Sequence, residues 1–151
     1  MADSVWWVGH TWTLTDIASE MDESEDQSWC YTLAEATAIL PDVRETTTRL
    51  QEIWLRAGTE RRKFDLAQTS DQSPVDVSLA HQALVAALWD VQPLVAWLRS
   101  RGIMLRDPST GLVDFPSEID GEESFLCWRI GEDEIGYWHG TDEGFDSRKP
   151  L

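Results

Sequence analysis

The stretch LCWRIGEDEIGYWH, residues 126–139, contains two short runs of alternating apolar and polar residues on either side of GEDE. Alternation with a period of two is typical of half-buried strands, and a Gly-containing connection between two such runs indicates a β-hairpin. The same stretch carries Cys127, one of two cysteines, and His139, one of three histidines. The hairpin therefore decides the fold of the C-terminal half and whether a thiol and an imidazole meet.

The hairpin ends a longer alternating region that begins at Ile103. We expect strands at IMLRD (103–107), GLVDF (111–115), SFLCWRI (124–130) and IGYWH (135–139), connected by PST, PSEIDGEE and GEDE. Consecutive strands joined by short connections pair in antiparallel fashion. The C-terminal half is therefore predicted to be a small antiparallel β-meander of three or four strands.

A first amphipathic helix precedes the strands. Thr32 and Glu35 have the spacing of a capping box, in which each side chain accepts a hydrogen bond from a backbone amide of the first turn. Apolar residues from Leu40 to Ala57 then recur at spacings of three and four, as on one face of a helix. Because proline disrupts a helix interior, we expect the helix to be kinked or restarted at Pro41. We expect a loop in the segment AGTERRKFDLAQTSDQSPVD (57–76), which contains Gly58 and the polar cluster QTSDQSP (68–74).

A second helix has apolar positions from Val77 to Leu98 with the same spacing. It is expected to kink at Pro93 and to end at Gly102, because glycine adopts the left-handed conformation that closes helices. Two helices of similar length with such stripes predict an antiparallel helical hairpin. The fold class is therefore predicted to be α+β, a hairpin of kinked helices followed by the β-meander.

Charge divides the chain of 151 residues into unequal parts. In total 28 acidic residues against 12 basic ones give a net charge of −16, and residues 1–31 carry seven acidic residues and no Lys or Arg. So acidic a chain is not expected to bind nucleic acid or an anionic membrane, since both attract a positive surface. Residues 1–30 are predicted to be a partly disordered extension, and residues 31–151 a single domain.

The extension combines an aromatic cluster at Trp6, Trp7 and Trp12 with an acidic linker. The tryptophans fit a strand or short helix docked on the domain, a partner-binding peptide, or a start of the reading frame that is not the native one. Neither a basic leader nor an apolar run long enough for a membrane span occurs, and the two cysteines have no C-x-x-C spacing. We therefore expect a cytoplasmic protein.

Two phrases resemble a known family. They are YTLAEATAILPDVRE (31–45) and LVDFPSEIDGEESFLCWRIGEDEIGYWHGTDEGFDSRKPL (112–151). They are similar to the small bacterial proteins of domain-of-unknown-function family 2203, in which a phrase like F-T-x-E-E-A-N-x-L-L-P opens a helical hairpin and a phrase like the second closes the chain. The resemblance spans about residues 31–151, and ATA stands where the family often has EAN. It implies the hairpin and the strands, and it implies no activity.

Cys127 and His139 carry ligand groups that zinc and related metals prefer. If GEDE is a four-residue turn, Ile130 faces Ile135 and Cys127 faces Trp138, which puts the thiol and the imidazole on opposite faces of the sheet. A turn of three or five residues, or a bulge, would instead bring them opposite each other. The alternative is a buried cysteine and a partly exposed histidine with no metal.

A metal site would need a further ligand, for which Asp142, Asp114 and His10 are available. Asp114, Asp142 and Asp146 also fit an acid/base pair or a divalent-cation site, although their contexts favour turns in which Asp accepts hydrogen bonds from backbone amides. Cys127 as a nucleophile would need His139 as its base and Arg129 as its electrostatic partner. Cysteines flanked by Leu and Trp are more often inert core.

A small-ligand pocket is a further hypothesis. Its polar residues would be Arg129, Tyr137, His139, Asp142 and Arg148, with tryptophans as walls, and its arginines would favour a small anionic ligand. Pairing of these arginines with nearby acidic residues would instead make them structural.

The helices predict self-association. Trp54, Trp89 and Trp97 need a broad opposing surface, which a two-helix hairpin with a small sheet does not provide, so we expect a homo-oligomer. The sequence thus favours an oligomeric interaction or small-ligand-binding module that uses the C-terminal strands, with a small anion or a protein as partner. The alternative is a metal-binding protein or enzyme that uses Cys127 and His139; no cofactor is firmly implied, and a divalent metal is compatible with these residues.

Overall fold

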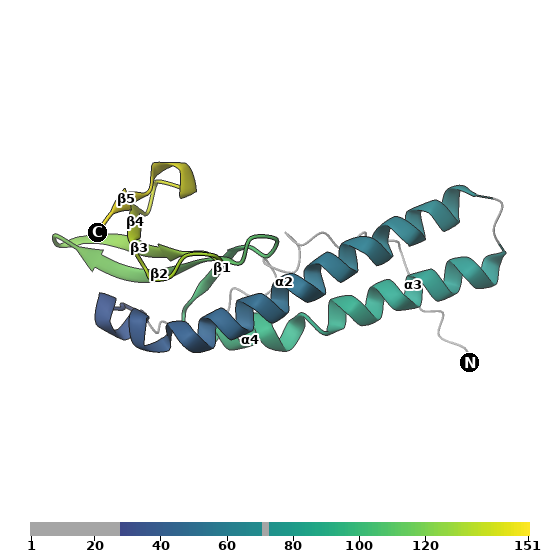
Figure 1. The fold of residues 1–151 in the computed structure, drawn as a ribbon, viewed down its shortest axis with the longest axis horizontal. Helices are drawn as coiled ribbons and strands as arrows, with labels where there is room; N and C mark the ends of the chain where they lie inside the picture. The colour runs from purple at the N-terminus through teal and green to yellow at the C-terminus, as the bar shows by residue number, and fades with distance from the viewer. Residues whose placement is uncertain (1–27, 71–72) are drawn as a thin grey trace, which may run out of the picture.

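The computed structural model describes residues 28–70 and 73–151. The helices are α2 (Leu33–Thr69), α3 (Pro74–Trp89) and α4 (Gln92–Arg99). The strands are β1 (Met104–Asp107), β2 (Leu112–Ile119), β3 (Glu122–Trp128), β4 (Tyr137–Gly140) and β5 (Lys149–Pro150), with a 3₁₀ helix η1 (Phe145–Ser147) before β5. Helices thus precede one antiparallel sheet, which confirms the α+β class (Figure 1). The tryptophan cluster, His10 and most of the acidic linker lie outside the described residues.

Helix α2 spans 37 residues and runs through both Pro41 and Gly58. It begins as predicted, with the Thr32 hydroxyl accepting from the Glu35 amide at 3.2 Å and the Glu35 carboxylate accepting from the Thr32 amide at 2.8 Å. The predicted loop begins later than expected, because α2 continues through Gly58 to Thr69; the break before α3 at Pro74 lies at the polar cluster QTSDQSP. Helix α2 does not restart at Pro41, because apolar residues on both sides of the proline are buried in one core. None of the described helices is both long and apolar enough to span a membrane.

The second arm of the helical hairpin consists of two helices. Helix α3 runs beside α2 in the opposite direction (Figure 1), and an ion pair of 2.8 Å joins Arg56 to Asp90. A kink within one helix was predicted here, but the helix ends at Trp89 and a separate helix begins at Gln92. Pro93 lies in the first turn of α4, a position that suits proline because the first amides of a helix have no intrahelical acceptor.

The sheet follows the chain order β1-β2-β3-β4-β5, and every neighbouring pair is antiparallel. It has one strand more than predicted, because residues 149–150 pair with β4. Strand β2 also continues to Ile119 where a loop was predicted, so the connection to β3 is only Asp120 and Gly121. Both have positive φ, 55° and 81°, as a two-residue type I′ hairpin turn requires.

The segment before α2 fastens the helices to the sheet. The Tyr31 amide donates to the Pro116 carbonyl at 2.7 Å, and the Ser117 hydroxyl donates to the Tyr31 carbonyl at 2.7 Å. Trp29 lies directly over Gly102, which ends α4 with φ of +66° as predicted, and the Trp29 indole occupies the space that a Cβ atom at this position would need. The segment before α2 is therefore hydrogen-bonded to β2 through Tyr31. It also packs through Trp29 on Gly102, where only glycine leaves enough space.

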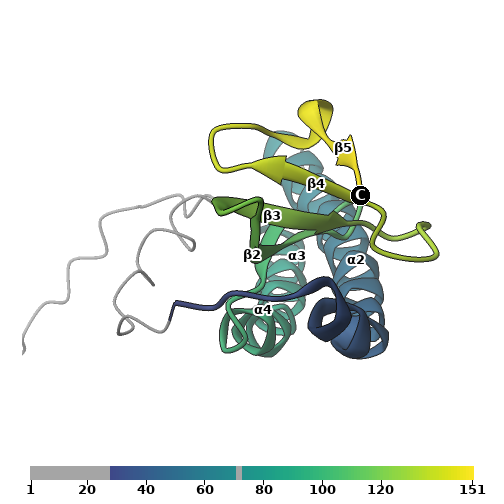
Figure 2. The same ribbon diagram turned by 90° about the vertical axis from the view of Figure 1, so that its left-hand side faces the viewer.

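The sheet has one face toward the helices and one away from them (Figures 1 and 2). Val113, Phe115, Leu126 and Trp128 share the first face and pack in one core with the first half of α2 and the end of α4. The opposite face lies beneath the yellow C-terminal segment that includes η1 (Figure 1). Because side chains alternate along a strand, the residues between these core positions point to that second face.

Candidate metal centre

Strands β3 and β4 pair in a register that places Cys127 and His139 on the same sheet face. Phe125 lies opposite His139, and Cys127 lies opposite Tyr137. Since Phe125 and Cys127 are two residues apart, their side chains point to one face, and His139 is diagonal to Cys127. The predicted pairing of Cys127 with Trp138 was wrong, because Cys127 pairs with Tyr137. The thiol and the imidazole therefore do not lie on opposite faces, as that pairing implied.

The difference arises in the connection between the strands, which is longer than GEDE. Strand β3 ends at Trp128 and β4 begins at Tyr137, so eight residues lie between them. Glu132 holds the connection in place: its carbonyl accepts from the Trp128 indole at 3.0 Å, and its carboxylate accepts from the Arg129 amide at 3.0 Å. Arg44 of α2 donates to the Asp133 carbonyl at 2.8 Å. With these contacts, β3 ends at Trp128, and Arg129 and Ile130 belong to the connection instead of the strand.

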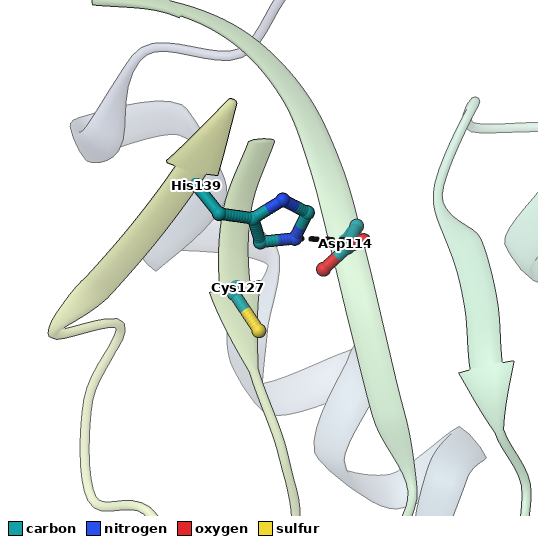
Figure 3. A group of neighbouring side chains, drawn as sticks. All are labelled: Asp114, Cys127 and His139. Carbon is teal, nitrogen blue, oxygen red and sulfur yellow. Dashed lines mark hydrogen bonds and ion pairs between the residues drawn. The ribbon is translucent and has the colours of Figure 1, made fainter. Parts of the chain in front are cut away.

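Three neighbouring strands each contribute one side chain to a buried group on this face. Asp114 of β2 lies directly opposite Cys127 of β3, and His139 comes from β4. One ligand atom from each lies within 4.8 Å of the other two, and all three residues are buried. Figure 3 shows His139 and Asp114 pointing toward each other across β3, with Cys127 beside them on the strand between. We call this group the Asp–Cys–His cluster.

The hydrogen bonds of His139 determine which ring nitrogen carries a proton. Its Nδ1 lies 2.9 Å from the Gly140 carbonyl, which only accepts, so Nδ1 is the donor. In the neutral ring Nε2 is then an acceptor, yet it lies 3.2 Å from the Asp114 carboxylate oxygen Oδ2 (Figure 3). Either a proton or a metal ion must bridge these two atoms. A backbone carbonyl that fixes Nδ1–H is the usual support of a metal-binding histidine.

Asp114 has one satisfied and one unsatisfied carboxylate oxygen. Oδ2 accepts from Arg106 Nε at 2.7 Å, whereas Oδ1 is buried and has no hydrogen-bond partner within residues 28–70 and 73–151. An unpaired buried carboxylate oxygen costs on the order of a few kcal/mol, so such atoms are rare in native proteins. A proton between His139 and Asp114 would leave Oδ1 with only the Cys127 thiol beside it, whose pKa is raised by burial and also by hydrogen bonding to Asp114, whereas a cation in the cluster would bind the carboxylate directly.

Cys127 is buried, and its thiol is held in the protonated form when no metal is bound. Burial raises the pKa of Cys127 to about 12, and the charge of Asp114 adds to this effect. Arg148, 3.9 Å from Sγ, opposes it only in part. The two nitrogens of His139 face Gly140 and Asp114, so neither is positioned to accept the thiol proton. The arrangement therefore does not fit a cysteine nucleophile with a histidine base.

A cavity of about 320 Å³ adjoins the cluster. Arg106, Asp114, Cys127 and His139 line one part of it; Leu112, Thr141, Glu143, Gly144 and Phe145 line the rest. The cluster is thus covered by the segment after β4 and still borders a space that small molecules can occupy.

The cluster fits a divalent transition metal. Thiolate, imidazole and carboxylate are all zinc ligands, and soft sulfur disfavours Mg²⁺ and Ca²⁺. Bond lengths of about 2.0–2.3 Å in a tetrahedral zinc site put ligand atoms about 3.3–3.8 Å apart. The separations here extend to 4.8 Å, a difference that small side-chain rotations can close. Three protein ligands leave the fourth position open toward the cavity.

The other predicted pocket residues are placed differently. Arg148 pairs with Glu132 at 2.8 Å and lies over the Tyr137 and Phe145 rings, while Arg129 lies 3.6 Å from Glu132. The predicted alternative of pairing with local acidic residues is thus what these arginines do. Asp142 is exposed in the turn after β4, outside the cluster, and Asp146 is exposed in η1.

Asp114 and Arg106 are the residues that sequence reasoning valued too little. Asp114 was one of several candidate ligands with a turn as its favoured context, and that context was wrong, because it lies inside β2. The alternation of VDF was the available signal: Val113 and Phe115 face the core, so Asp114 must face the other side. Arg106 had no signal of its own, because its role depends on pairing with Asp114 across strands.

Comparison with known proteins gives one match. The family described as "Uncharacterized conserved protein (DUF2203)" matches residues 29–151, which include the whole cluster. No curated protein and no solved structure shows significant similarity to the chain. The chain therefore belongs to the DUF2203 family of uncharacterised conserved proteins.

Proposed function

We propose that this protein binds a divalent transition metal, with Zn²⁺ as the reference ion, through Asp114, Cys127 and His139. The observation that carries the proposal is the unsatisfied hydrogen bonding inside the cluster. The acceptor nitrogen of His139 faces a carboxylate oxygen, and the second oxygen of Asp114 is buried without a partner among the described residues. One cation placed between the three strands satisfies both atoms and also pairs with the thiolate.

The charges around the cluster support the same proposal. Asp114 and a Cys127 thiolate balance the charge of a divalent ion, and the neutral imidazole adds a ligand without adding charge. Arg106 supports Asp114 as a hydrogen-bonded group outside the ligand set, which is the usual arrangement for ligating carboxylates. An open fourth position next to a cavity is typical of zinc sites that bind an exchangeable ligand.

The test is metal content together with calorimetric titration of metal-free protein with Zn²⁺. We expect about one equivalent of zinc, and a loss of at least about 100-fold in affinity in Asp114→Asn, Cys127→Ser and His139→Gln. Matched controls are Asp142→Asn, Cys30→Ser and His81→Gln, which change exposed residues of the same types outside the cluster. Zinc affinity that survives all three cluster substitutions would overturn the proposal.

We also infer that two copies of the chain associate through the helical arm, the part of α2 from Trp54 onward together with α3. At about 1.5 Å per residue α2 is about 55 Å long, and the sheet covers only its first half (Figure 1). In the arm only Ala57, Ala67 and Ala87 are buried. Larger apolar side chains of the arm, such as Phe64, Leu84 and Leu88, are only half-buried, so the arm buries little apolar surface for so long a helix pair.

The arm also exposes large apolar side chains that a partner would cover. Leu66 is 66 % exposed, Val75 65 % and Trp89 69 %. Val75, Leu79 and Trp89 lie within one face of α3, since at about 3.6 residues per turn Leu79 and Trp89 lie about 40° to either side of Val75. A second copy supplies the same two apolar helices, so the two arms would form a four-helix bundle.

Light scattering on the full chain tests this association. We expect a mass of twice 17.2 kDa, reduced toward the monomer in Leu66→Glu and in Trp89→Glu. Leu151→Glu is the control, because Leu151 is an exposed apolar residue at the C-terminus, far from the arm. A monomeric mass for the unchanged chain at micromolar concentration would contradict the inference.

A further inference from the structure

We propose that the open metal position and the Arg106 guanidinium together bind a small monoanionic carboxylate in the cavity. This inference rests on the proposed metal site and adds the chemical class of its ligand. One carboxylate oxygen would occupy the fourth metal position, and the other would accept hydrogen bonds from Arg106. Both partners line the same cavity of about 320 Å³, so one small molecule can reach both.

The size of the cavity limits the ligand. Its volume is at the lower end of small-molecule sites, which span about 300–1,000 Å³. One part of the wall is polar, with the cluster and Arg106, while Leu112 and Phe145 supply apolar surface elsewhere. A ligand with a carboxylate at one end and a short apolar body fits this division of the wall.

Arg106 is held so that part of its guanidinium remains available. Its Nε donates to Asp114 Oδ2 at 2.7 Å, which fixes the plane of the group, and the Phe125 ring lies 5.2 Å from its Cζ. The terminal nitrogens have no hydrogen-bond partner within the described part of the chain, and the side chain is 43 % exposed. Arginine in this state offers two parallel donors, the geometry that matches a carboxylate.

The charges of the cavity favour an anion with a single negative charge. A divalent metal is balanced by Asp114 and the Cys127 thiolate, so the positive charge of Arg106 remains uncompensated. The other charged groups nearby are already paired: Glu143 with Lys149 at 3.1 Å, and Arg148 with Glu132 at 2.8 Å. Glu143 lines the cavity, and its carboxylate disfavours a second negative charge on the ligand.

The test uses the full chain loaded with Co²⁺, whose visible spectrum reports changes in its ligands, titrated with acetate and with inorganic phosphate. We expect saturable spectral changes with acetate, and weaker binding of phosphate. In Arg106→Lys, which keeps the charge and loses the paired donors, acetate affinity measured at a Co²⁺ concentration that saturates the variant should fall about tenfold or more. Arg56→Lys is the control, because Arg56 lies on α2, pairs with Asp90 and does not line this cavity, so the change should leave acetate binding unchanged.

The outcomes separate the two proposals. A protein that takes up no Co²⁺ contradicts the metal site and the carboxylate site together. Uptake of Co²⁺ without a spectral response to acetate, or with a response unchanged in Arg106→Lys, overturns only the carboxylate inference. Tighter binding of phosphate than of acetate overturns the choice of a carboxylate. If Arg106→Lys fails to fold, the comparison of the two anions on the unchanged chain still decides.

Discussion

Asp114 and Cys127 lie directly opposite each other across β2 and β3, on the face of the sheet that points away from the helices. Neither side chain contributes to the apolar core on the other face, and both are buried. A carboxylate beside a thiolate is unfavourable without a cation, because the charge of one opposes ionisation of the other, so the Cys127 thiol keeps its proton until a metal binds. The predictions below follow from this pairing and from the contacts that impose it.

The first prediction concerns the pH dependence of zinc binding. The pKa of the Cys127 thiol is raised to about 12 without metal, so zinc must displace its proton throughout the neutral range. This step alone makes the association constant rise about tenfold per pH unit. Zinc titrations at two pH values one unit apart measure the slope. In Cys127→Ser this tenfold contribution per pH unit to the association constant should be lost. An equal dependence on pH in both proteins would show that the thiol is not a ligand.

The second prediction concerns the stability of the metal-free protein in alkali. The pKa of Cys127 is raised in the folded state from 9.0 to about 12, so the folded state retains a proton that the unfolded chain releases. The resulting stabilisation is fully present below pH 9 and is lost as the pH rises to about 12. Urea titrations across this window should show a steeper fall in the free energy of unfolding than in Cys127→Ser. Parallel curves would contradict the raised pKa.

The third prediction concerns Glu132, which holds the connection between β3 and β4. Glu132→Ala removes the carboxylate that accepts from the Arg129 amide and from Arg148, and should lower the free energy of unfolding by about 1–3 kcal/mol. Zinc affinity should fall as well, because the register of β4 places His139. Glu134→Ala is the control, since Glu134 is exposed in the same connection. Equal effects of the two substitutions would rule out the proposed role of Glu132.

The fourth prediction compares two glycines. Gly102→Ala should lower the free energy of unfolding by at least about 1 kcal/mol, because its φ is +66° and Trp29 occupies the space of a Cβ atom. Gly58→Ala should instead raise it by about 0.5–1 kcal/mol, because Gly58 lies inside α2 with no atom within 4 Å of a new Cβ. Thermal unfolding of both variants checks the difference in sign. A stabilising Gly102→Ala would show that Trp29 does not pack there.

The sequence was most informative where structure depends on neighbouring residues. The capping box at Thr32, the helix end at Gly102 and the alternation of the strands each reflect contacts a few residues apart, and all three are present. The prediction of a loop from Pro116 onward was wrong, because β2 continues to Ile119. Pro116 lies beyond the end of β1, and its carbonyl accepts a hydrogen bond from the Tyr31 amide instead. Such a distant partner leaves no local pattern.

The candidate centre was only partly predictable for the same reason. Cys127 and His139 were candidates by residue type, but their meeting depends on a register set by Glu132 and its contacts with Trp128, Arg129 and Arg148. A shift of one residue moves every side chain of a strand to the other face, so no local count could decide it. Asp142, Asp114 and His10 were all available as the third ligand, and no local pattern distinguished Asp114 from the other two.

X-ray absorption at the zinc edge tests the ligand set most directly. Zinc-loaded protein should show one sulfur neighbour at about 2.3 Å and nitrogen or oxygen neighbours at about 2.0–2.2 Å. The sulfur neighbour should disappear in Cys127→Ser and remain in Cys30→Ser, the matched change at an exposed cysteine. A first shell without sulfur in the unchanged chain, or a sulfur neighbour that persists in Cys127→Ser, would contradict the Asp114, Cys127 and His139 site.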